Sequence, residues 1–129
     1  METLTRALMV GAGGFVGSAL RYSTSIWVQR WASTTQLPLA TLVVNVIGCL
    51  LIGLIGGAAD TRLELSHGTW LFLVVGVLGG FTTFSAFGNE VFMLTQGGHR
   101  LHALGHVFLH LLLGIGAAAL GYALAGRGL

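Results

Sequence analysis

Apolar residues dominate four long stretches of the chain, and short polar segments separate these stretches. The stretches cover residues 4–27, 38–59, 70–94 and 101–125. A helix needs about 20 mostly apolar residues to cross the hydrocarbon core of a bilayer, and each stretch is long enough to do so. We therefore predict an all-α membrane fold with four transmembrane helices, in a single domain that covers residues 1–129.

The composition indicates that these helices are surrounded by lipid rather than by water. Of the 129 residues, 54% are hydrophobic and only 8% are charged, which leaves too little polar surface for a soluble domain. The N-terminus lacks the order of basic, short apolar and small residues that marks a cleaved signal peptide, so we expect the first helix to be retained. Cys49 is the only cysteine, so we expect no internal disulfide and interpret this residue as a small packing residue.

The six basic residues are all arginines, and they are scattered rather than gathered in a patch that would bind nucleic acid. If both termini lie on one side of the membrane, Arg6, Arg62 and Arg127 share that side. Arg30 and Arg100 lie on the other, so the positive-inside rule gives almost no preferred orientation and dual topology is expected. Four helices are too few to enclose a polar path, which favours an antiparallel homodimer.

Small residues four positions apart recur within the predicted helices. The pairs are Gly13 with Gly17, Gly53 with Gly57, Gly76 with Gly80, and Ala117 with Gly121. In a membrane such pairs let two helix backbones approach closely, so we predict tight helix packing at these positions.

The third stretch contains an unusual polar segment at residues 79–87, where two glycines and three hydroxyl residues interrupt an apolar helix. Exposed backbone in lipid is costly, so we predict a helix that is broken at mid-membrane and buried in protein. Gly80 or Thr82 is expected to cap the second half-helix, whose positive end would then lie at the membrane centre. The alternative is a kink that serves packing alone.

Other polar or aromatic residues in the stretches have two interpretations each. Asn45, in the middle of the second stretch, either donates to an anion or forms an interhelical hydrogen bond. Arg21 lies deeper than a residue that reaches the interface, and we interpret it as a structural or vestibular cation. Phe84 and Phe87 share a helix face and either pack in the core or present positive ring edges to an anion.

Residues 79–87, GGFTTFSAF, resemble the GGxTTFSTF signature of the Fluc, or CrcB-like, fluoride channels, with Ala86 in place of the last hydroxyl residue. Further matches cover essentially the whole chain and include Gly13-Gly14 with Gly17, Arg21-Tyr22, and Asn45-Val46 with Gly48. The resemblance implies an antiparallel dual-topology dimer in the bacterial inner membrane. It also implies passive fluoride export and two fluoride pathways per dimer.

The resemblance also implies roles for individual residues. Asn45, Thr41, Thr83 and Ser85 would line the fluoride path, and Phe84 and Phe87 would offer ring edges to the ion from different subunits. The backbone carbonyls of Gly79 and Thr82 from both subunits would hold a central structural sodium ion. Arg21 and Glu90 would serve in a vestibule or in structure.

The fourth stretch departs from the family pattern. The family's tyrosine and small hydroxyl residue fall on His106 and His110, and His99 and His102 continue the same spacing. A neutral imidazole can donate one hydrogen bond as a hydroxyl does, whereas a protonated one would attract or trap an anion. We place His106 and His110 on the path and expect His110 to make conduction depend on pH, with the direction left open. Hydrogen bonds to neighbouring helices are the alternative.

Three other functions are less consistent with the sequence. A transition-metal transporter could use His106 and His110, but Glu90 is the only carboxylate near them. A small multidrug-type exporter, also a dual-topology dimer, needs a buried carboxylate where this chain has Arg21. A purely structural protein would not need a broken third helix. No nucleophile, base and orienting group occur together, so we do not expect an enzyme. Whether the dimer partner is this chain or a paralogue is left open.

Overall fold

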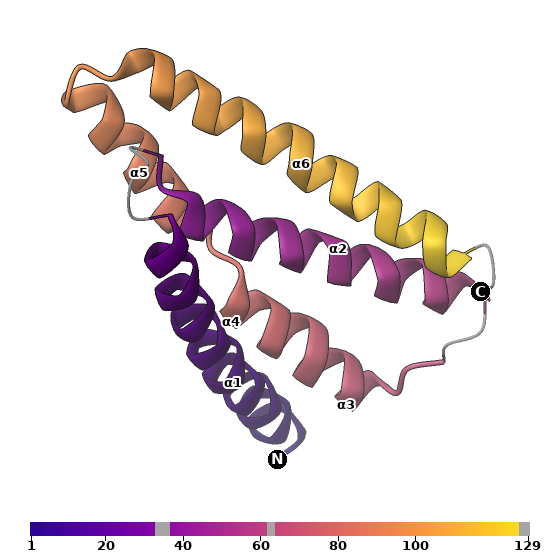
Figure 1. Ribbon diagram of the computed structural model, residues 1–129. Helices are drawn as coiled ribbons and strands as arrows, with labels where there is room; N and C mark the ends of the chain where they lie inside the picture. The colour runs from indigo at the N-terminus through magenta and orange to yellow at the C-terminus, as the bar shows by residue number, and fades with distance from the viewer. Residues whose placement is uncertain (33–36, 62–63, 127–129) are drawn as a thin grey trace.

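The computed structural model describes residues 1–32, 37–61 and 64–126, and every regular element in these ranges is helical (Figure 1). The elements are α1 (Glu2–Trp31), α2 (Leu39–Thr61), α3 (His67–Trp70), the π-helix η1 (Leu71–Leu78), α4 (Gly79–Phe81), α5 (Phe84–Gln96) and α6 (Arg100–Gly126). The run from α3 to α5 forms one long segment, which we call the third segment. Four pieces are long and apolar enough to cross a membrane: α1, most of α2, the third segment and α6. The prediction of an all-helical chain with four such helices is confirmed.

The helices are slightly longer than the hydropathy pattern predicts. Residues 29–31 were expected in a loop but form the end of α1, where Arg30 complements the negative end of the helix dipole. Asp60 and Thr61 were also expected in a loop but belong to α2. The other predicted loop positions at 33–36 and 62–63 lie outside the described residues, as do Arg62 and Arg127 of the topology argument.

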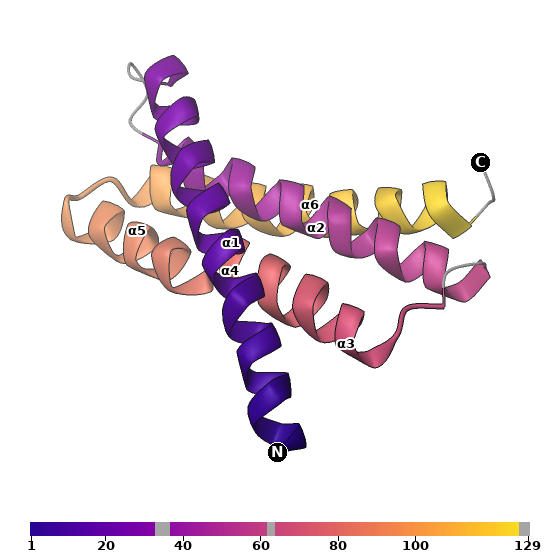
Figure 2. The same ribbon diagram turned by 90° about the horizontal axis from the view of Figure 1, so that it is seen from below.

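The helices pack in two pairs. In both views α2 and α6 lie side by side over most of their length, and α1 crosses the third segment at η1 and α4 (Figures 1 and 2). Toward its C-terminal end the third segment approaches α6 through α5. The start of α1 and the end of α6 both lie at the end of the molecule where α2 ends and α3 begins (Figure 1).

Glycines mark both of these packing contacts. A Cβ atom on Gly80 would lie 2.6 Å from the carbonyl oxygen of Gly14, so a larger residue would push α4 away from α1. A Cβ atom on Gly53 or Gly121 would overlap backbone atoms of the facing helix in the α2–α6 pair. The prediction of tight packing at small residues is therefore confirmed at these positions.

The interior of the chain is small, and much of its apolar surface points outward. The buried apolar residues are Val28, Leu42, Val44, Leu78, Phe81 and Ala103. Large exposed side chains include Phe15, Phe84, Leu104, Phe108 and Ile115. A soluble protein rarely exposes so much contiguous apolar surface, whereas lipid or a second subunit would cover it favourably.

Candidate functional site

The third segment is interrupted between Phe81 and Phe84. Thr82 (φ −79°, ψ 156°) and Thr83 (φ −151°, ψ 117°) are extended, and α5 starts immediately afterwards. Thr83 caps α5, because its hydroxyl oxygen accepts a hydrogen bond of 3.3 Å from the Ala86 N–H. The predicted caps, Gly80 and Thr82, are wrong: Gly80 is still helical, and the Thr82 side chain turns back to donate to the Leu78 carbonyl at 2.9 Å.

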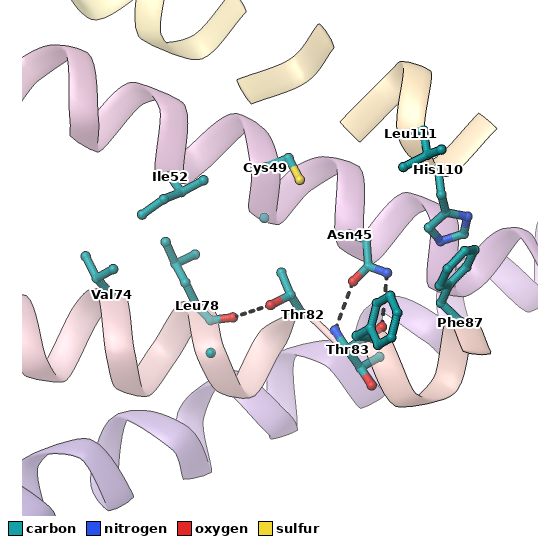
Figure 3. Close-up of a pocket in the computed structure, with 13 residues that line it drawn as sticks. Asn45, Cys49, Ile52, Val74, Leu78, Thr82, Thr83, Phe87, His110 and Leu111 are labelled. Atoms are coloured by element: carbon teal, nitrogen blue, oxygen red, sulfur yellow. Dashed lines mark hydrogen bonds between the residues drawn. The ribbon is translucent and has the colours of Figure 1, made fainter. Parts of the chain in front are cut away.

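Asn45 on α2 binds the interrupted backbone through both ends of its amide. Its NH2 group donates to the Thr83 carbonyl at 3.1 Å, and its oxygen accepts from the Thr83 N–H at 2.9 Å (Figure 3). In a continuous α-helix the Thr83 N–H would donate to the Gly79 carbonyl, so Asn45 replaces one helical bond. Asn45 is thus an interhelical partner, and the second N–H of its amide is left over from these two bonds.

Two carbonyl groups are released by this arrangement. Within residues 1–32, 37–61 and 64–126, no backbone hydrogen bond across the interruption ends on the carbonyl of Gly79 or Thr82. Carbonyl oxygens suit hard cations, so these two groups are chemically suited to bind an ion such as sodium. A Cβ atom on Gly79 would meet nothing closer than 3.9 Å, so this position is also open.

An open cavity of about 520 Å³ lies beside the interruption, between α2, the third segment and α6 (Figure 3). Five residues predicted on the fluoride path line it: Asn45, Thr83, Phe84, Phe87 and His110. The rings of Phe84 and Phe87 lie 5.6 Å apart at their centres, and the Phe87 ring lies 4.3 Å from that of His110. The walls therefore combine aromatic rings with a few polar groups, and Phe84 is 82% exposed.

A second polar group joins α2, α5 and α6 near Phe87, whose ring centre lies 5.7 Å from that of His106. The Thr41 hydroxyl donates to one oxygen of the Glu90 carboxylate, and His106 Nε2 lies 3.1 Å from the other oxygen. His106 is completely buried. Thr41 lines two smaller cavities, of about 330 and 180 Å³, rather than the large one, and Arg21 lines the smaller of these. Thr41 and His106 thus do not line the large cavity, although Thr41 shares the smallest of these cavities with Thr83.

The sequence matches a known family over most of its length. The family described as "CrcB-like protein, Camphor Resistance (CrcB)" matches residues 8–122. The chain belongs to the CrcB family. Three similar proteins are each named "Fluoride-specific ion channel FluC". The one from Thermus thermophilus is 47% identical over 123 residues (94% of each chain). Those from Chloroflexus aurantiacus and Flavobacterium psychrophilum are both 40% identical; the first alignment covers 94% of this chain and 95% of its relative, the second 90% and 93%.

The histidines of this CrcB protein do not form one continuous polar face. His99 precedes α6 and His102 is exposed, whereas His106 is buried and His110 lines the large cavity. Among the described residues no group of three or more His, Cys, Asp or Glu residues could hold a metal ion.

Some placements were not anticipated from the sequence of this CrcB protein. From the sequence, Glu90 was assigned only a vestibular or structural role. Glu90 follows Phe87 by three residues, so both lie on one helix face, and this spacing could have predicted that they share neighbouring residues. Cys49, interpreted as a packing residue, lines the large cavity. Ser85 is exposed, and its hydroxyl lies 3.1 Å from that of Thr83 rather than in the cavity wall.

Proposed function

We propose that this chain is a fluoride-selective channel that lets fluoride leave a bacterial cell passively, down its electrochemical gradient, and so relieves fluoride toxicity. The observation that carries the proposal is the interruption at Thr82 and Thr83, which opens a polar and aromatic cavity in an otherwise apolar CrcB protein. Relatives that align with at least 90% of this chain are named as fluoride-specific channels, which supports the same function here.

The cavity offers groups that can replace the water around a small anion. The spare N–H of Asn45 and the hydroxyl of Thr83 are donors in the cavity wall, and the Ser85 hydroxyl lies next to that of Thr83 outside the wall. Donors compensate the loss of hydration that a selective pore requires. Phe84 and Phe87 present ring edges, which carry partial positive charge. Their rings are tilted by 54° to each other, so an ion moving past one ring can meet the edge of the other.

The second polar group extends the path toward α1. Arg21 lies at the small cavity that Thr41 and Thr83 share, where its charge attracts anions. Glu90 holds the Thr41 hydroxyl and the His106 ring, so its role is to fix the positions of these two side chains. The Thr41 hydroxyl serves fluoride only when it turns away from Glu90.

The working unit is an antiparallel homodimer with dual topology in the bacterial inner membrane. The polar groups of the large cavity, which is open on one side, need a cover that is less apolar than lipid, and a second copy supplies it. The carbonyls of Gly79 and Thr82 from both copies would hold a structural sodium ion, which would supply positive charge next to these oxygens.

Fluoride efflux from liposomes that contain the purified protein tests the function. We expect fluoride to leave quickly and chloride to be retained, with protein-free liposomes as the control. Chloride efflux at the fluoride rate would contradict the proposed selectivity.

Cysteine crosslinking in membranes and the detection of terminal tags test the assembly. We expect a crosslinked antiparallel dimer and tags on both faces of the membrane. Tags on one face alone would refute dual topology.

A further inference from the structure

The side chains of His106 and His110 each leave one ring nitrogen unused. His106 Nδ1 and His110 Nε2 are both buried and have no hydrogen-bond partner among the residues that the structure describes. A buried polar atom without a partner is unfavourable, so a ligand that satisfies it is favoured. His110 lines the large cavity and His106 does not, so of the two unused nitrogens the one on His110 belongs to a residue beside the space that a ligand could occupy (Figure 3).

The hydrogen-bond partner of His110 Nδ1 determines which ring nitrogen carries the hydrogen. His110 Nδ1 lies 3.1 Å from the backbone carbonyl of His106, and a carbonyl oxygen can only accept. Nδ1 must therefore carry the hydrogen, since the bond made by one ring nitrogen determines the tautomer of the ring. In the neutral ring the unused nitrogen, Nε2, has a lone pair and no hydrogen.

This tautomer prevents the neutral ring from binding fluoride. Fluoride is an acceptor, and the Nε2 lone pair would repel it. We propose that His110 binds fluoride only together with one proton, so that its imidazole acts as a proton-linked fluoride ligand on the path. The proton comes from water, attaches to Nε2 and donates to the ion, which is equivalent to hydrogen fluoride donating to the neutral ring. When fluoride leaves, the proton returns to water.

The groups around His110 agree with this requirement for a proton. On α6 the His106 ring lies 4.4 Å away at its centre, and on α5 the Phe87 ring lies 4.3 Å away. The α5 carboxylate, Glu90, is hydrogen-bonded to His106 rather than to His110. The titratable group that α2 contributes to this cavity is the thiol of Cys49. Of the residues that line this cavity, only His110 can become positively charged.

The proposal rests on the proposed function and determines the sign of its pH dependence. Above the pKa of the ring, the protonated fraction falls about tenfold for each pH unit, and fluoride affinity at His110 falls with it. A serine at this position, which donates through a hydroxyl at any pH, would not show this dependence.

Calorimetric titration of the purified full-length protein with sodium fluoride tests the proton linkage directly. Titrations at pH 7.5, which is about one unit above the ordinary imidazole pKa, are compared in buffers with different enthalpies of ionisation. The dependence of the observed heat on the buffer gives the number of protons taken up. We expect close to one proton for each fluoride bound at this site in the wild-type protein, and uptake that disappears as the pH is lowered below the pKa. Fluoride binding without proton uptake would overturn the proposal.

Two variants assign the proton to its residue. His110→Ser should bind fluoride without proton uptake, whereas His102→Ser, which changes an exposed histidine on the same helix, should keep the wild-type uptake. Proton uptake that persists in His110→Ser would overturn the assignment to His110. If that variant does not fold, the wild-type titration still tests the proton linkage.

Fluoride efflux from liposomes separates this inference from the proposed function. Efflux whose rate does not change between pH 6.5 and 8.5, a range that starts at the ordinary imidazole value of about 6.5, refutes the proton linkage and leaves the channel intact. No efflux at any pH refutes both.

Discussion

Replacing Asn45 by alanine or by aspartate separates its hydrogen bonds to the third segment from its place on the proposed fluoride path. Alanine removes both bonds to the Thr83 peptide. Aspartate keeps an oxygen that accepts from the Thr83 N–H, but its second oxygen faces the Thr83 carbonyl, so a repulsive contact between two acceptors replaces the other bond. Aspartate also places a negative charge in the wall of the cavity.

The two variants should differ more in conduction than in stability. A hydrogen bond between membrane helices contributes about 0.6 kcal/mol on average and up to about 1.7 kcal/mol, so alanine should lower the free energy of unfolding by about 1–3 kcal/mol. Aspartate should lower it at least as much, because it loses one of the two bonds and places a charge within the membrane. A carboxylate about 5 Å from a fluoride ion repels it by about 3 kcal/mol at an effective dielectric constant of about 20, which lowers occupancy about a hundredfold. Per folded molecule, the aspartate variant should therefore be a much poorer channel than the alanine variant.

Thermal unfolding of the purified proteins and fluoride efflux from liposomes, at equal amounts of folded protein, measure the two quantities. We expect both variants to be less stable than the wild type, and efflux per folded protein to fall in the order wild type, Asn45→Ala, Asn45→Asp. If the two variants conduct fluoride equally well per folded protein, Asn45 is only an interhelical partner and does not meet the ion.

Three further changes test other parts of the structure. Phe84→Ile and Phe87→Ile should each slow fluoride efflux at least tenfold without changing the size of the purified assembly, because shape is roughly kept and the ring edge is lost; wild-type efflux in both would assign the rings to packing. Gly80→Ala should lower the free energy of unfolding by about 1–3 kcal/mol, because its Cβ would press on the Gly14 carbonyl. Gly88→Ala is the matched control: a Cβ there meets nothing within 4 Å, so thermal unfolding should show an unchanged or slightly more stable protein. Equal destabilisation in both glycine variants would contradict the packing argument.

The sequence alone determines the features that depend on neighbouring residues along the chain. Long apolar stretches predict four helices because a bilayer sets the number of apolar residues a helix needs. The run of glycines and hydroxyl residues at 79–87 predicts an interruption, because such residues weaken a helix and offer side-chain partners to its backbone. The same run identifies the family, since it is long and unusual.

Only the tertiary structure decided which polar groups meet. Asn45 and Thr83 are 38 residues apart, and Thr41 and Glu90 are 49 apart, so their pairing depends on how whole helices pack. The sequence left open whether Asn45 is an interhelical partner, and it could not tell that His106 is bound to Glu90 while His110 faces the cavity. Periodicity places residues on a helix face, but the rotation of that face toward a neighbour is set by contacts such as the close approach of Gly14 and Gly80, which join distant parts of the chain.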